Sequence, residues 1–259
     1  MRRKMNVAAS IAACLGALAI SGLAAPALAL DVDLELVLAI DISRSVDDEE
    51  AQLQREGYMQ ALTDPRIIDA IRSGALGRIA VIYVEWAGSQ YQRTIADWAV
   101  IDGPESAQAF ARSIGDAPRV AEMWTSISGA LAYGAAKLDD NGFEGKRRVI
   151  DVSGDGRNNS GPDVAQIRDA VVARGITING LPIMSERANF GRPPERDLDI
   201  YYEQNVIGGP GSFMVPAMDF PDFARAVRTK LIKEISGLPY GDGVDLAETQ
   251  DGRAPPAGR

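Results

Sequence analysis

Apolar segments of two kinds alternate along most of the chain. Continuous or alternating apolar runs are typical of strands, whereas apolar residues three and four positions apart are typical of helices. The runs predict strands at residues 34–40, 78–86, 92–101, 148–153, 176–183 and 212–216. The helical spacing predicts helices at residues 47–62, from Pro65 onwards, and at 107–114, 127–138, 164–171, 199–206 and 220–235.

This alternation predicts an α/β domain: a doubly wound, mostly parallel sheet with helices on both faces. The run at 34–40 is interrupted only by Glu35, which is typical of the buried centre of a parallel sheet. Strand 92–101 is more polar and follows the turn at Gly88-Ser89. We therefore expect strands 78–86 and 92–101 to form one antiparallel edge.

The first 29 residues have the pattern of an export signal. Basic residues 2–4 precede an apolar segment at 7–23, and Ala27-Leu28-Ala29 has the small-x-small form of a cleavage site. We expect cleavage near Ala29, no transmembrane anchor afterwards, and a periplasmic or secreted protein. A lipoprotein signal at Cys14 is a weaker alternative, because much apolar sequence lies beyond it.

Residues 30–236 form the predicted domain, and residues 237–259 are rich in Gly, Pro and charge, which predicts a disordered tail. The formal charge is −9, and it becomes −12 once the three basic residues of the leader are removed. Such an acidic chain is a poor partner for nucleic acid, whose phosphates need a basic surface. No G-x-x-x-x-G-K-[ST] motif occurs, so nucleotide binding has no support.

The chain has no His, and its single Cys lies in the leader. A Ser-His-Asp triad, a Cys-His pair and His-ligated zinc are therefore excluded. Any metal must be held by oxygen atoms, which favours Mg²⁺, Mn²⁺ or Ca²⁺.

Oxygen-bearing side chains stand at three predicted loop positions. Asp41, Ser43 and Ser45 follow the strand at 34–40, Thr125 precedes the helix at 127–138, and Asp155 follows the strand at 148–153. If the first and last of these strands are neighbours, all five residues meet where the winding of the sheet reverses. Singly, Ser45 and Thr125 could be helix caps and Asp155 part of a plain turn.

Together the three segments resemble the metal-ion-dependent adhesion site (MIDAS) of von Willebrand factor A (vWA) domains. The D-x-S-x-S motif stands at 41–45, the Thr motif as Thr125 with Ala130-Leu131, and the last motif as Asp155-Gly156. The resemblance covers residues 31–236. The chain is also similar to an uncharacterised subgroup of exported bacterial vWA-like proteins.

The resemblance implies a Rossmann-like sheet with a divalent cation, usually Mg²⁺, at its edge. Hydroxyls such as those of Ser43, Ser45 and Thr125 bind the metal directly in this family, while carboxylates such as Asp41 and Asp155 often act through water. Such a site accepts an acidic group from a partner protein or surface polymer as a further ligand. This function is binding without bond breaking, so no catalytic residue is expected.

Five further residues are candidates around the site. Trp124 stands where the family often has a small residue, and it is either folded under the sheet edge or exposed beside the ion. Exposed, it would be a contact for a partner, and Arg44 and Arg157 are further partner-binding candidates. Asp48 and Glu49 fall where some related domains hold an adjacent metal, although acidic residues at a helix start explain them adequately.

Two other functions compete with the binding module. Aspartate after a strand can be a nucleophile in Mg²⁺-dependent phosphatases. That chemistry usually needs a second carboxylate two residues later, and Ser43 occupies this position. The chain could also be a scaffold whose metal site has no function. We predict a binding module rather than an enzyme.

Overall fold

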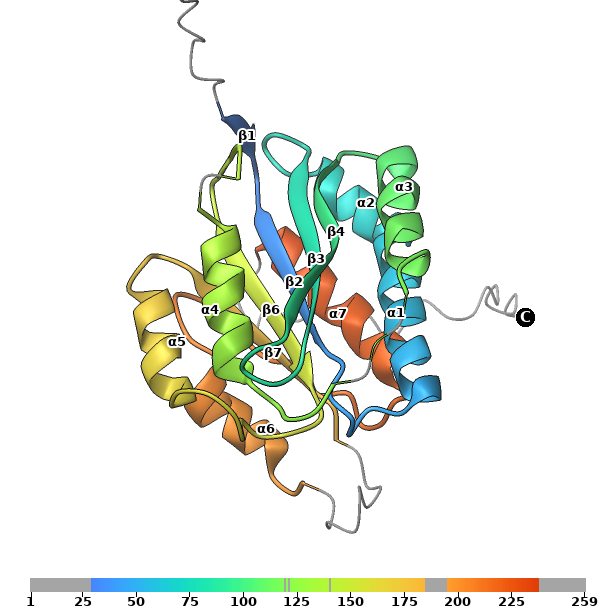
Figure 1. Ribbon diagram of the computed structural model, residues 1–259. Coiled ribbons are helices and arrows are strands. Elements are labelled where there is room, and N and C mark those ends of the chain that lie inside the picture. The colour runs from blue at the N-terminus through green and yellow to red at the C-terminus, as the bar shows by residue number, and fades with distance from the viewer. Residues whose placement is uncertain (1–28, 119, 121, 140, 185–194, 238–259) are drawn as a thin grey trace, which may run out of the picture.

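A five-stranded sheet forms the centre of the computed structural model, which describes residues 29–118, 120, 122–139, 141–184 and 195–237 (Figure 1). Its strands are β2 (Glu35–Asp41), β3 (Ile79–Trp86), β4 (Gln92–Ile101), β6 (Arg148–Gly154) and β7 (Thr177–Pro182). Their order is β4-β3-β2-β6-β7, and every neighbouring pair is parallel except β3 and β4. The predicted doubly wound sheet with one antiparallel edge strand is confirmed.

Helices cover both faces of this sheet, as predicted (Figure 1). One face carries α1 (Asp48–Leu62), α2 (Pro65–Arg72), α3 (Pro104–Gly115) and α7 (Phe223–Ser236). The other carries α4 (Ile127–Lys137), α5 (Val164–Val172) and α6 (Leu198–Tyr201), which continues as a π-helix, η1 (Tyr202–Val206). None of the described helices is long and apolar enough to cross a bilayer.

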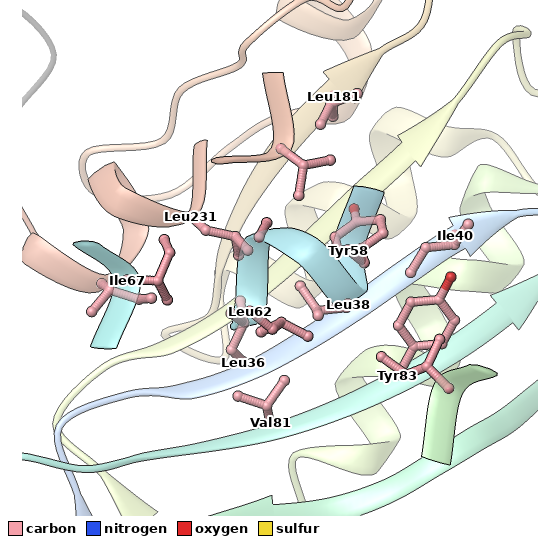
Figure 2. Packing of buried hydrophobic residues seen from close by; sticks show 14 of the residues in the cluster. Leu36, Leu38, Ile40, Tyr58, Leu62, Ile67, Val81, Tyr83, Leu181 and Leu231 are labelled. Atoms are coloured by element: carbon pink, nitrogen blue, oxygen red, sulfur yellow. The ribbon is translucent and has the colours of Figure 1, made fainter. Parts of the chain in front are cut away.

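The two faces of β2 supply two separate cores, because successive side chains of a strand point to opposite faces. Leu36, Leu38 and Ile40 pack against α1 and α7, as Figure 2 shows. Val37 and Ala39 pack against the α4 side. Every residue of β2 is buried, including Glu35, whose carboxylate accepts hydrogen bonds from Asn141 Nδ2 at 2.5 Å and Gly145 N at 2.6 Å.

A capping box begins α1 directly after the D-x-S-x-S segment. Asp47 Oδ1 accepts from the backbone N–H groups of Glu49 and Glu50, and Glu50 Oε2 accepts from Asp47 N. This reciprocal pairing satisfies donors that the first turn of a helix leaves without partners. The acidic run at 47–50 is thus accounted for by the start of the helix.

Two of the predicted elements differ from the structure. Residues 212–216 form no strand, and Met214 makes only an isolated bridge with Gly180, because the next donor of β7 in this register, Pro182, lacks an N–H. Residues 220–222 precede α7 as a turn, in which Phe223 N donates to Phe220 O.

The structure also contains a small parallel sheet that the sequence pattern did not predict, formed by β1 (Leu30–Val32) and β5 (Phe143–Gly145). Strands of three residues are too short for a periodic signal. The predicted leader, apart from Ala29, and the predicted tail beyond Gly237 lie outside the described residues.

Candidate metal-binding site

The site lies where the central strands β2 and β6 end side by side. Ile40 pairs with Ser153 in the last step of their parallel register, so Asp41 and Asp155 emerge at the same edge of the sheet. The chain passes from β2 to β3 on one side and later to β6 on the other, which makes this the point where the winding reverses. The prediction that these two strands are neighbours is confirmed.

Asp41 is fully buried at the end of β2. Its Oδ1 accepts a 2.7 Å hydrogen bond from Ser43 N, whereas its Oδ2 has no hydrogen-bond partner among the described residues. A Cβ at Gly154 would lie 2.9 Å from that Oδ2 and 3.1 Å from Tyr202 Oη. Any larger residue at position 154 would therefore crowd Asp41 Oδ2, and glycine leaves room for this oxygen.

The two serines of the motif connect both aspartates. Ser43 Oγ and Ser45 Oγ are 2.8 Å apart, and Ser45 Oγ donates a 2.7 Å hydrogen bond to Asp155 Oδ1. Side chains from two loops separated by more than a hundred residues thus meet at one point.

Thr125 joins this group from the segment before α4. It is buried, and a Cβ at Gly156 would lie 3.6 Å from its Oγ1, so its hydroxyl faces the loop after β6. Its N–H donates to Asn159 Oδ1 at 2.8 Å, and its carbonyl accepts from Asn159 N at 2.9 Å and Ser160 N at 3.2 Å. The structure therefore brings all five predicted residues to one edge of the sheet.

Asn158 completes the attachment of the same loop. Its Oδ1 accepts from Ser128 N at 3.0 Å and from Ser128 Oγ at 3.2 Å, at the start of α4. Asn158 and Asn159 together hold the loop after β6 against α4 and Thr125. Tyr202, whose Oη lies next to Gly154, was not among the predicted site residues. It lies on a π-helix, which has no sequence signature in a single chain.

The electrostatics of the aspartates favour a bound cation. Burial and the neighbouring Asp155 raise the pKa of Asp41 well above its usual range. Burial also raises the pKa of Asp155 to about 6, although the hydrogen bond from Ser45 opposes the shift. Within the described residues, neither carboxylate forms an ion pair with Lys or Arg. Two carboxylates, one of which has an unsatisfied buried oxygen, and three hydroxyls fit a hard divalent cation.

The additional candidates differ in their surroundings. Trp124 is 57% exposed, so the exposed alternative holds. Arg44 is exposed, and its N–H donates to Glu122 O at 2.9 Å. Arg157 pairs with Glu195 at 3.1 Å and lies 4.9 Å from the centre of the Tyr201 ring.

An adjacent metal site at Asp48 and Glu49 gains no support. Both side chains are exposed in the first turn of α1, and the described part of the chain gathers no third acidic or His/Cys ligand around them. Their charge at the positive end of the helix dipole is explanation enough.

The fold is of the vWA type. Similar solved structures are proximal thread matrix protein 1 (PTMP1) from the mussel byssus, the pilus adhesin SpaC from Lactobacillus rhamnosus GG and a von Willebrand factor type A protein from Catenulispora acidiphila. Their TM-scores are 0.58, 0.58 and 0.53 at 15%, 14% and 16% identity. The chain belongs to the family described as "Protein of unknown function (DUF1194)", whose sequence model matches residues 31–239.

These likenesses are domain-sized. The matches cover 80%, 81% and 79% of this chain but 49% of PTMP1, 32% of SpaC and 43% of the Catenulispora protein. The chain therefore spans half or less of each of these structures. No curated protein matches the sequence.

Proposed function

We propose that the protein is an exported, divalent-metal-dependent binding module that coordinates an acidic group of a partner. The observation that carries the proposal is a pair of neighbouring carboxylates, Asp41 and Asp155, which have raised pKa values and no basic partner among the described residues. Within the fold alone this pair is destabilising, because two negative charges share a poorly solvated place. A divalent cation would neutralise both.

Each residue of the site has a distinct part in this proposal. Ser43, Ser45 and Thr125 would hold the cation through their hydroxyl oxygens, and Asp41 and Asp155 would offset its charge and fix the serines. The bound metal supplies a coordination position for a carboxylate of the partner. Mg²⁺ is our first choice, with Mn²⁺ and Ca²⁺ as alternatives, because all donors are oxygen.

The comparisons support the proposal at the level of the domain type. One structure of PTMP1 is described with a zinc-occupied MIDAS motif, and SpaC is described as a pilus adhesin. The predicted leader supports export to the periplasm or beyond. The partner would be a protein or surface polymer, and neither nucleic acid nor nucleotide.

The proposed function involves no bond breaking. A phosphatase-like reaction usually needs a second carboxylate two residues after Asp41 as acid or base, and Ser43 stands at that position instead. The solved structures named above are described as matrix, adhesin and vWA proteins rather than as enzymes. Hydrolysis of an aryl phosphate that disappears in Asp41→Asn would overturn this part of the proposal.

Calorimetric titration tests the metal site directly. Mg²⁺, Mn²⁺ and Ca²⁺ are titrated into the metal-free wild type, Asp41→Ala and Ser45→Ala, with Glu49→Ala as a control that removes an exposed carboxylate nearby. We expect binding to the wild type and the control, and none or much weaker binding to the two site variants. Equal heats from all four proteins would reject the site.

The partner is sought by affinity capture from envelope extract. The immobilised wild type is loaded with Mg²⁺, washed, and eluted with a chelator, with Asp41→Ala as the matched control. Proteins or polymers that elute from the wild type alone are candidate partners. The same material recovered from both proteins would contradict metal-dependent recognition.

A further inference from the structure

Two large apolar side chains are exposed directly beside the candidate metal site. Met123 is 55% exposed and Trp124 is 57% exposed, and both immediately precede the buried Thr125. Neither side chain therefore contributes much buried apolar surface to the stability of the fold. Exposed aromatic and methionine side chains next to a binding site are typical of contact surfaces for partners.

The backbone that presents these side chains is unusual. Trp124 has φ +71°, in the left-handed region that residues with a side chain rarely adopt. Such conformations persist only where the surrounding structure holds them, and they gather at functional sites. Two contacts hold this one: Gly88 N donates to Met123 O at 3.1 Å, and Ser126 N donates to Ala87 O at 2.8 Å.

Gly88 is matched to the turn that it contacts. A Cβ at position 88 would lie 2.7 Å from Met123 O and 3.3 Å from the Cβ of Trp124. The connection after β3 thus has a glycine at the position where the Met123-Trp124 turn leaves no room for a side chain. The turn is held in place rather than free to fold its apolar side chains inward.

A positively charged residue pairs with the same segment through its backbone. Arg44 is exposed between the serines of the metal motif, and its N–H donates to Glu122 O, one residue before Met123. The surface around the proposed cation site therefore includes an exposed arginine and an exposed apolar pair. Positive charge attracts a carboxylate even though the chain as a whole carries a formal charge of −9.

We propose that Met123 and Trp124 form the specificity surface of the site, and that its partner is a polypeptide segment with an Asp or Glu next to an apolar side chain. The carboxylate goes to the metal and the apolar side chain packs on Trp124 and Met123. This inference rests on the proposed function. A polypeptide fits better than an acidic polysaccharide, because Met123 offers no hydrogen-bond donor to sugar hydroxyls and methionine adapts to varied apolar side chains.

A displayed library of random peptides tests the inference with Mg²⁺ as the only added metal. Selection uses the mature wild type, elution uses a chelator, and recovered peptides are synthesised. We expect Asp or Glu beside an aromatic or aliphatic residue, and affinity that falls roughly 10-fold or more in Trp124→Ala, as for a binding hot spot. Trp124→Gly, which suits the left-handed backbone, separates loss of the indole from strain in the turn and should show the same loss.

Two controls make the outcomes decisive. Leu76→Ala removes an apolar side chain that is 38% exposed between α2 and β3, at the opposite edge of the sheet, and should bind peptides as the wild type does. The Mg²⁺ affinity of every variant is measured first, so that peptide affinities are compared at saturating metal. No Mg²⁺ binding by the wild type means that the proposed function fails.

With Mg²⁺ binding intact, three results would overturn the specificity surface alone. These are a selection without metal-dependent peptides, selected peptides without apolar neighbours, and peptide affinity unchanged in both Trp124 variants. Mg²⁺-dependent binding of polygalacturonate in place of any peptide would likewise assign the surface to an acidic polysaccharide and reject the polypeptide.

Discussion

Ser45 Oγ donates a 2.7 Å hydrogen bond to Asp155 Oδ1 across 110 positions of sequence. This contact joins the loop after β2 to the loop after β6, the two central strands of the sheet. The serine hydroxyl partly compensates a carboxylate that has no basic partner within the described residues. The raised pKa of Asp155, about 6, shows that the compensation is incomplete.

Asp155→Asn should therefore stabilise the metal-free protein and remove its response to metal. The asparagine still accepts from Ser45 but carries no charge, which relieves repulsion with Asp41. The shift of the pKa from 3.8 to about 6 corresponds to an increase of about 1–3 kcal/mol in unfolding free energy near neutral pH. Thermal unfolding with and without Mg²⁺ measures both effects. A variant less stable than the metal-free wild type, or one still stabilised by Mg²⁺, would contradict the assignment.

Asn159→Ala should weaken metal binding without unfolding the domain. The neutral side chain of Asn159 accepts from Thr125 N at 2.8 Å and so orients that residue. Loss of an orienting partner of a metal ligand typically lowers affinity by about 10–100-fold. Asn159→Asp keeps an acceptor oxygen and should retain more of the affinity. Calorimetry with Mg²⁺ distinguishes the two variants, and equal affinities in both would show that the hydrogen bond does not matter.

The sheet and the five site residues could be predicted because each leaves a local signal. The apolar run that ends at Asp41 marks a central strand, and D-x-S-x-S follows it within five residues. The left-handed conformation of Trp124 leaves no such signal, since the contacts that hold it come from Ala87 and Gly88 on a different loop. Long-range hydrogen bonds of this kind depend on how the elements pack, which local patterns of apolar and polar residues do not reveal.

The buried ion cluster below the site shows the same limit. Lys230 of α7 lies 2.5 Å from Asp151 of β6 and 2.5 Å from Glu234, and all three are at most 1% exposed. In the sequence, Asp151 interrupts an apolar strand and Lys230 lies within an apolar helical face, each an isolated exception. Only the packing of α7 on β6 makes them partners.

This cluster predicts that the metal-free protein loses stability as pH rises from about 4 to about 7. Burial and Glu234 raise the pKa of Asp151 from 3.8 to about 7, so the folded state binds a proton that the unfolded state releases in this range. The contribution is complete below the unfolded pKa and is lost as pH passes the folded one. Asp64 and Asp222 have lowered pKa values and act below about pH 4. Urea unfolding across this range, with Asp151→Asn showing a flatter profile, is the test.

Lys230→Met should be strongly destabilising. Removal of the only ammonium in contact with Asp151 and Glu234 among the described residues leaves two buried carboxylates without compensation, which typically costs about 3–5 kcal/mol. The double variant Lys230→Met/Glu234→Gln removes one of those charges and should recover part of the loss. Urea unfolding at neutral pH gives both values. A single variant as stable as the wild type would mean that the carboxylates are already neutral.

Gly154→Ala and Gly156→Ala form a matched pair on the same loop. A methyl group at 154 would lie 2.9 Å from Asp41 Oδ2 and displace the carboxylate, whereas one at 156 would lie 3.6 Å from Thr125 Oγ1, an ordinary contact. We expect Gly154→Ala to lower stability by about 1–3 kcal/mol, as overpacking does, and to weaken Mg²⁺ binding at the same time. Gly156→Ala should change neither by much, because this glycine does not have a positive φ. If Gly154→Ala binds Mg²⁺ as tightly as Gly156→Ala does, then Asp41 is not fixed by the packing around Gly154 and its position is not critical for the metal.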